Sequence, residues 1–318
     1  MSHEIESMFF VGETPWRNLG NRLIDAPSCA EAIKQAGLDW AVKTVPLFLA
    51  DGTKVETAKA TVRDTDSRVL GVVGSRYCPL QNSEAFSFFD PFVQSGLVNL
   101  ETAGSLRDGQ RIWILARIAE NSDMDIGAGD AVRKFLMLSN SHDGTLSVRV
   151  GFTPIRVVCA NTLAGAHNSA ESQLIRLKHH ASVAKNLEQM REIINLANRS
   201  FEASAEKYRF LASKKINQDD LRKYVKIVLG HEKTEDDDLS TRASNQIDQI
   251  ENLFRNGRGS NLVTADGTFW GAYNAVTEFM SHHQTENADK RYSSLWFGAN
   301  SKRNTDALEL AVELAKAA

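Results

Sequence analysis

The chain is poor in cysteine and proline, with 3 Cys and 6 Pro among 318 residues. Cys29, Cys78 and Cys159 stand far apart, and no pair has the C-x-x-C spacing typical of zinc and thiol redox sites. We therefore expect no disulfide framework and no metal site. No apolar run reaches the roughly 18 residues needed to cross a bilayer, and the N-terminal stretch is acidic where a secretory signal would be basic. These features predict a cytoplasmic protein with no membrane partner.

The sequence also lacks the motifs of the common enzyme classes. It contains no phosphate-binding G-x-x-x-x-G-K-[ST] loop, no G-x-G-x-x-G after a strand, no H-E-x-x-H and no G-x-S-x-G. The pairs His179-His180 and His282-His283 are adjacent, so on a helix the two rings of each pair point about 100° apart and do not chelate one ion together. We assign no catalytic residue, no metal ligand and no cofactor. An enzyme of unfamiliar type, built around Asn161, His167, Cys159 or the histidine pairs, remains an alternative.

Hairpin signals are present in the first half of the chain. Three Asp-Gly dipeptides, at 51–52, 108–109 and 143–144, each lie between stretches of β-branched and apolar residues, which predicts three antiparallel hairpins. The first hairpin gains a third strand, and a helix over 82–96 is expected next, capped by Asn82 or Ser83 and ended by Gly96. Pro154 is expected to interrupt the last hairpin, because proline has no N–H to donate.

The period of the apolar residues becomes helical after residue 160. From Glu171 to Lys215 they recur at steps of three or four, which predicts one long amphipathic helix or two in succession. Shorter helices follow, one of them with an Asn217 cap and a Gly230 stop, and the acidic run EKTEDDDLS is expected to be a solvated loop. The fold class is therefore α+β. The N-terminal half is expected to hold an antiparallel β-meander and hairpins with one helix, and the C-terminal half is expected to be helical. We expect a β-rich domain at 1–165 and a helical region at 166–318 packing on it; the alternative is one continuous domain.

Charge is uneven along the chain although the formal net charge is −3. Residues 140–230 hold 14 basic and 8 acidic residues, whereas the segments before and after them are both net acidic. A hairpin strand, a helix start and a basic helix face within this segment could together line a groove for a sugar-phosphate backbone. The candidate phosphate-contacting residues are Arg149, Arg156, Arg176, Lys178 and Lys185. The alternative is that Arg149 and Arg156 pair with carboxylates on neighbouring strands.

Aromatic residues recur at helical spacing further along the chain. Phe269, Trp270 and Tyr273 would form one face of a helix. Such a face is more often used for packing within the chain than for stacking on bases. It is also a candidate interface between copies of the chain, and on this basis a homo-oligomer is expected.

Four stretches carry a family resemblance: MFFVGETPWRNLG, GFTPIRVVCANTLAGA, GTFWGAYNAVTEFMSHH and RYSSLWFGANSKRNTDALELA. Through them the chain resembles, end to end, the phage- and plasmid-borne proteins grouped as domain of unknown function 932. The resemblance implies a mobile-element setting, in which proteins that handle DNA are common. The expected order of strands and helix is also similar to the core of ring-forming single-strand-annealing proteins, although no motif of that group is present.

Two hypotheses of different class follow, beside the enzyme alternative. In the first, the protein binds single-stranded DNA along its basic middle segment, in an oligomer that promotes annealing, and needs no catalyst. In the second, it is a structural or host-factor interaction protein that assembles through its aromatic helix face and binds no nucleic acid. Grouping of the basic side chains on one surface would favour the first hypothesis.

Overall fold

The computed structural model describes residues 5–12, 20–118, 123–156, 158, 161–162, 175–176, 187–285, 294–295 and 298–318. The chain divides into two compact units, each assembled from three segments. Unit 1 consists of Met1–Glu120, Phe135–Gly151 and Leu174–Ala197. Unit 2 consists of Asn121–Lys134, Phe152–Gln173 and Asn198–Ala318. The expected boundary at 165/166 lies outside the described residues.

The described elements confirm the α+β class, with most of the strands in the first half of the chain and the long helices in the second. The strands are β1 (Ile5–Val11), β2 (Asn21–Leu23), β3 (Val42–Phe48), β4 (Lys54–Arg63), β5 (Val69–Gly74), β6 (Val98–Leu106), β7 (Arg111–Ile118), β8 (Met124–Asp125), β9 (Ala131–Ser141), β10 (Arg149–Arg156), β11 (Asn161–Thr162) and β12 (Ile175–Arg176). The helices are α1 (Cys29–Gln35), α2 (Asn82–Ser87), α3 (Asp90–Gln94), α4 (Leu187–Ala212), α5 (Gln218–Leu229), α6 (Thr241–Asn256), α7 (Phe269–Glu278) and α9 (Ala299–Ala317). None of these helices is long and apolar enough to cross a membrane.

A nine-stranded sheet contains most of the strands. Its order is β11-β10-β9-β7-β6-β1-β2, with β12 pairing with β10 and β8 with β9. The hairpins predicted at Asp108-Gly109 and Asp143-Gly144 are the β6–β7 and β9–β10 connections. At the first of these turns Arg107 and Asp108 both have positive φ, as a tight hairpin turn requires. No hairpin signal predicts β1, which pairs antiparallel with β6 and parallel with β2.

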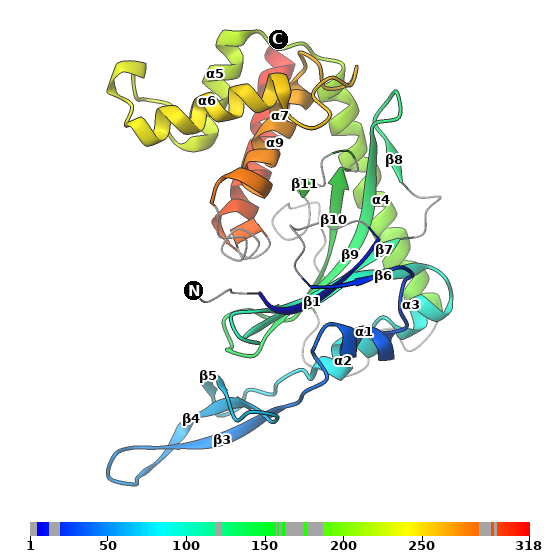
Figure 1. The fold of residues 1–318 in the computed structure, drawn as a ribbon, viewed down its shortest axis with the longest axis vertical. Helices are drawn as coiled ribbons and strands as arrows, with labels where there is room; N and C mark the ends of the chain where they lie inside the picture. Colours follow the sequence, from blue (N-terminus) through cyan, green and yellow to red (C-terminus); the bar gives the residue numbers. More distant parts are fainter. Residues whose placement is uncertain are drawn as a thin grey trace. The chain divides into compact units, whose positions relative to one another are not determined.

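Unit 1 also contains a separate three-stranded sheet in the order β3-β4-β5, drawn in blue and cyan in Figure 1. It is the meander predicted around Asp51-Gly52. The single helix expected over 82–96 is instead two short helices, α2 and α3. Asp90 and Pro91 start the second helix, because proline fits the first turn of a helix and not its interior. Phe86, Phe89 and Phe92 anchor the two helices in the core of unit 1.

Unit 2 contains α5, α6, α7 and α9, which lie together in Figure 1. Asn217 caps α5 through its side chain, and Gly230 ends that helix with φ of 84°, as predicted. Every residue of α7 is buried, so this helix is the centre of the helical core. It continues into a π-helix at Phe279–His283.

Two predicted boundaries differ from the structure. Strand β10 runs through Pro154 and continues to pair with β11, because a missing N–H removes one ladder hydrogen bond without ending the strand. The helix expected from Glu171 is wrong at Ile175–Arg176, which form the strand β12 because they pair with β10. The described helix α4 begins at Leu187, and residues 177–186 lie outside the described part of the chain.

Candidate nucleic-acid interface

Strand β10 presents two different faces. The ring of Phe152 lies 6.0 Å from the ring of Phe201 in α4, and Lys134 Nζ of β9 lies 5.9 Å from the same ring. Because side chains alternate along a strand, Arg149 points to the opposite face from Phe152. Arg149 is partly exposed, whereas its neighbours Val148 and Val150 are buried. The prediction that Arg149 is turned away from the apolar side of its strand agrees with this arrangement.

Two further arginines lie on the Arg149 face of the sheet. Lys134 marks the α4 side of β9, so the odd-numbered positions of β9 point the other way. The register of the β7–β9 pair sets Arg111 opposite Ser141 and Arg117 opposite Phe135, which puts both arginines on the Arg149 face. Both are partly exposed. They stand six residues apart on β7, a separation of about 20 Å along the strand.

The pairing of β12 with β10 brings a fourth arginine next to Arg149. The α-carbons of Arg149 and Arg176 are direct partners in this antiparallel pair. Like charges at directly opposite positions destabilise a strand pair, and an anion between them removes that cost. Arg111, Arg117, Arg149 and Arg176 all belong to unit 1, and we refer to them as the arginine cluster.

The arginine cluster surrounds a buried centre. Trp113 and Met137 on the same face are fully buried, so they offer no aromatic platform for a base. Arg111 donates a hydrogen bond to Thr145 Oγ1 at 3.1 Å, which fixes it beside the β9–β10 turn. This face can therefore contact an anionic backbone along its margins and does not provide base recognition.

Arg156 must be removed from the set of phosphate-contacting residues. It lies in unit 2, where its guanidinium is buried and donates to both carboxylate oxygens of Asp130 at 2.8 and 2.7 Å. Thr264 Oγ1 and Trp270 Nε1 donate to the same carboxylate. Burial alone would raise the pKa of Asp130, but the contact with Arg156 holds it below its ordinary value. Arg156 therefore follows the alternative given by the sequence, in which it pairs with a carboxylate of a neighbouring part of the chain.

The predicted aromatic interface needs a similar correction. Phe269, Trp270 and Tyr273 are each at most 1% exposed, so none of them can contact a second molecule. Trp270 packs on Tyr208 with ring centroids 4.8 Å apart. The helical spacing of these aromatic residues reflects packing inside unit 2.

The other sequence candidates lie outside the described residues. These are Lys178, Lys185, His167 and Cys159, and for Asn161 and Arg176 the structure describes the backbone only. Among the described residues, no group of three or more His, Cys, Asp or Glu side chains is arranged to hold a metal ion.

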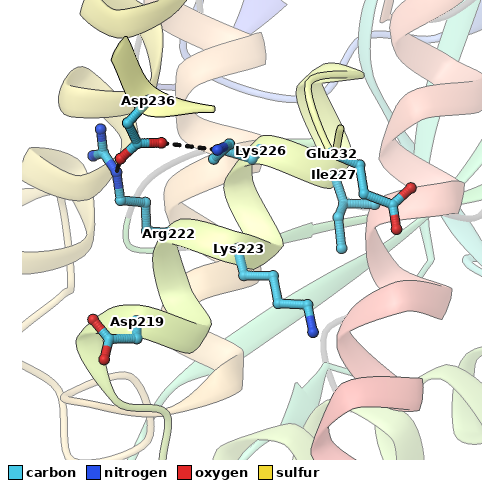
Figure 2. Close-up of a pocket in the computed structure, with 7 residues that line it drawn as sticks. All are labelled: Asp219, Arg222, Lys223, Lys226, Ile227, Glu232 and Asp236. Carbon is cyan, nitrogen blue, oxygen red and sulfur yellow. Dashed lines mark hydrogen bonds and ion pairs between the residues drawn. The ribbon is translucent and has the colours of Figure 1, made fainter. Parts of the chain in front are cut away.

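A second basic cluster lies on α5, beside the acidic loop of unit 2 (Figure 2). It borders a hollow of about 250 Å³ lined by Asp219, Arg222, Lys223, Lys226, Ile227, Glu232 and Asp236. Arg222 Nε and Lys226 Nζ lie 2.7 and 2.8 Å from the carboxylate oxygens of Asp236, and Arg222 also pairs with Glu251. The hydrogen bond with Asp236 raises the pKa of Arg222 above its usual range. Arg222 and Lys226 are neutralised within the chain, so the hollow is a poor phosphate site.

Comparison with protein families identifies the chain. Residues 69–312 match the family described as a domain of unknown function (DUF932). The chain belongs to the DUF932 family. Among curated proteins and among solved structures, none matches this DUF932 protein. The match spans β5 to α9 and so includes the arginine cluster.

Sequence reasoning missed two members of this DUF932 protein's arginine cluster. Arg111 and Arg117 lie before the basic middle segment, in a stretch whose overall charge is negative. The available signal was the alternation in RIWILAR, which sets both arginines on the same side of a strand as Trp113. Only the pairing of β7 with β9 relates that side to Arg149.

Proposed function

We propose that this DUF932 protein binds single-stranded nucleic acid through the arginine cluster of unit 1. The observation that carries the proposal is the direct register of Arg149 with Arg176, on a sheet face that also holds Arg111 and Arg117. An anion between Arg149 and Arg176 would reduce the repulsion between the two guanidinium groups. A row of anions could contact Arg111 and Arg117 as well. A polynucleotide backbone supplies anions in that form.

The expected mode of binding is electrostatic and largely independent of sequence. Arginine guanidinium groups donate paired hydrogen bonds to phosphate oxygens. Each phosphate that is bound releases condensed counterions, so the affinity should fall steeply as the salt concentration rises. Because the centre of the face is buried, the bases would stay accessible for pairing with a second strand. An annealing or recombination role in a phage or plasmid setting is part of this proposal.

The proposed location is the cytoplasm. Both described cysteines, Cys29 and Cys78, are free thiols. Free thiols fit a reducing compartment such as the cytoplasm.

The decisive experiment measures the anisotropy of a fluorescent oligothymidylate at several salt concentrations. In the R149E/R176E variant, affinity should fall by an order of magnitude or more at low salt. The slope of log K against log salt should become shallower by about one for each phosphate that the variant no longer binds. The control is R242E. Arg242 is exposed on α6, so this variant reverses the charge of an arginine in unit 2, outside the arginine cluster.

Circular dichroism of both variants confirms that they are folded. Equal affinity of wild type and R149E/R176E, or an equal decrease in R242E, would contradict the proposal. Parallel titrations with duplex DNA distinguish a preference for single strands from general polyanion binding.

A further inference from the structure

The hairpin of β3 and β4 ends in an exposed aromatic ring. Phe48, the last residue of β3, is 60% exposed, and Leu49 in the turn is 57% exposed. Among the described residues, Phe48 is the one Phe, Tyr or Trp whose side chain is exposed. The turn beyond it is closed by the Leu49 N–H, which donates to the carbonyl of Thr53 at 2.8 Å. The hairpin therefore holds a hydrophobic ring in water at a defined position.

A shift in strand register opens a hollow next to this ring. Pro46 pairs with Lys59, but Leu47 pairs with Val55, so residues 56–58 of β4 have no partner on β3. Extra residues in one strand bend it and change the direction of its side chains. The hollow beside this bulge has a volume of about 240 Å³. The polar and charged residues that line it are Thr44, Lys54, Glu56, Lys59 and Ser75.

Phe48 and two lysines lie on the same face of the hairpin. Phe48 pairs directly with Lys54, and Pro46, two residues before Phe48, pairs directly with Lys59. Because alternate residues of a strand point the same way, these four side chains share one face. Both lysines also line the hollow. The ring therefore stands at the edge of a hollow that contains two ammonium groups.

The hollow has a net positive charge. Lys54 Nζ forms an ion pair with Glu56 at 3.0 Å, and the two side chains are 50% and 75% exposed. An ion pair that is so exposed to solvent contributes little free energy. Among the described residues, Lys59 has no ion-pair partner. An anion in the hollow would bind Lys59 and would compete with a single solvated carboxylate for Lys54.

The same face of the hairpin leads to the arginine cluster. Thr61 lies two residues beyond Lys59, and its Oγ1 donates to the carbonyl of His142 in the β9–β10 turn at 2.7 Å. Three residues further along that turn, Thr145 Oγ1 accepts the hydrogen bond from Arg111. The end of the hairpin lies at most about 23 Å from Thr61 along β4. The β9–β10 turn therefore connects the face that carries Phe48 with one margin of the arginine cluster, and both belong to unit 1.

We propose that single-stranded nucleic acid bound to the arginine cluster continues onto this face of the hairpin, where the Phe48 ring stacks on a base and Lys54 and Lys59 bind the phosphates beside it. This inference rests on the proposed function and supplies the base contact that the arginine cluster lacks. An unpaired base presents the free π-face that stacking requires. A lipid surface fits less well: the hydrogen bond from the Thr53 N–H lowers the pKa of Asp51, so the turn keeps a negative charge.

The test compares oligothymidylate with an abasic oligonucleotide of the same length, which has the backbone without bases. F48A should weaken the binding of oligothymidylate by about 5- to 150-fold, the effect of losing one stacked base. Its affinity for the abasic strand, and the slope of log K against log salt, should equal those of wild type. F48W keeps a stacking ring and should bind as wild type does. I24A is the matched control, because Ile24 is 89% exposed in unit 1 and lies outside the hairpin.

The variant K59E tests the phosphate contact. It should weaken the binding of both oligonucleotides and make the salt slope shallower by about one. If R149E/R176E weakens binding while F48A binds as I24A does, the hairpin inference is wrong and the proposed function stands. A decrease in F48A that is equal for both oligonucleotides would also overturn the inference, since the ring would then not stack on a base.

Two further outcomes would overturn it. If F48A loses binding to phosphatidylglycerol vesicles but keeps its affinity for oligothymidylate, the end of the hairpin contacts membranes instead. If wild type binds neither oligonucleotide, the hairpin inference and the proposed function are both wrong. Circular dichroism of each variant confirms that it is folded.

Discussion

His142 Nε2 donates a hydrogen bond to Asn82 Oδ1, with the two atoms 2.9 Å apart. The direction is fixed because Asn82 turns its Nδ2 toward the carbonyls of Leu38 and Trp40. His142 is fully buried, and its Nδ1 has no hydrogen-bond partner among the described residues. The neutral imidazole therefore joins the β9–β10 turn to the helix α2.

Stability should depend on pH through His142. Burial lowers its pKa from 6.5 to about 4. Between these values the unfolded chain binds a proton that the folded chain does not, so stability is full above pH 6.5 and falls as the pH drops toward 4. At pH 5 the decrease is about 2 kcal/mol relative to pH 7. Urea unfolding at the two pH values measures it.

The variant His142→Gln isolates this contribution. Its amide can still donate to Asn82 and does not titrate. Burial raises the pKa of Glu278, so protonation of this carboxyl favours the folded state as the pH falls. This effect opposes that of His142 and is the same in wild type and in His142→Gln. If the stability of His142→Gln decreases at pH 5 as much as that of wild type does, His142 is not the titrating group.

Arg156 should be required for stability and not for binding. Arg156→Ala leaves the Asp130 carboxylate buried without its cation, which costs about 3–5 kcal/mol. The double variant Asp130→Leu with Arg156→Met should cost less, since it removes both charges. Chemical unfolding compares them. Folded Arg156→Ala should bind oligothymidylate with wild-type affinity, and a decrease equal to that of R149E/R176E would return Arg156 to the binding surface.

Gly104 should not tolerate a side chain. It lies on β6 where β1 approaches, and a Cβ there would be 2.6 Å from Cη2 of the buried Trp113. Gly104→Ala should destabilise unit 1 by about 1–3 kcal/mol because the strands must move apart. Gly74→Ala, in open space, should change stability by less than about 1 kcal/mol. Thermal unfolding of the two variants gives the comparison, and equal effects would contradict the close approach.

Arg111 and Arg117 should contribute to salt-dependent binding although they lie outside the basic middle segment. Arg111→Gln with Arg117→Gln should lower the slope of log K against log salt by about two, one for each arginine. Oligothymidylate titrations at increasing salt measure the slope. An unchanged slope would confine the binding surface to Arg149 and Arg176.

The sequence determined the local structure well where its signals act over a few residues. Asp-Gly turns fixed the hairpins, and Asn217 and Gly230 fixed the ends of α5, because capping and turn chemistry depend on neighbours in the chain. The sequence also determined the alternation of side chains along each strand. It did not predict that Pro91 divides a helix in two.

Tertiary structure alone decided which charges face solvent. Arg149 and Arg156 both lie on β10, seven residues apart, yet one is partly exposed and the other is buried against Asp130. A count of charges along the chain treats the two alike, because the burial of a guanidinium depends on a carboxylate distant in sequence. The same holds for Trp270, whose helical spacing fits both a core and an interface. Strand register and long-range packing separate these cases, and neither is encoded in a short stretch of residues.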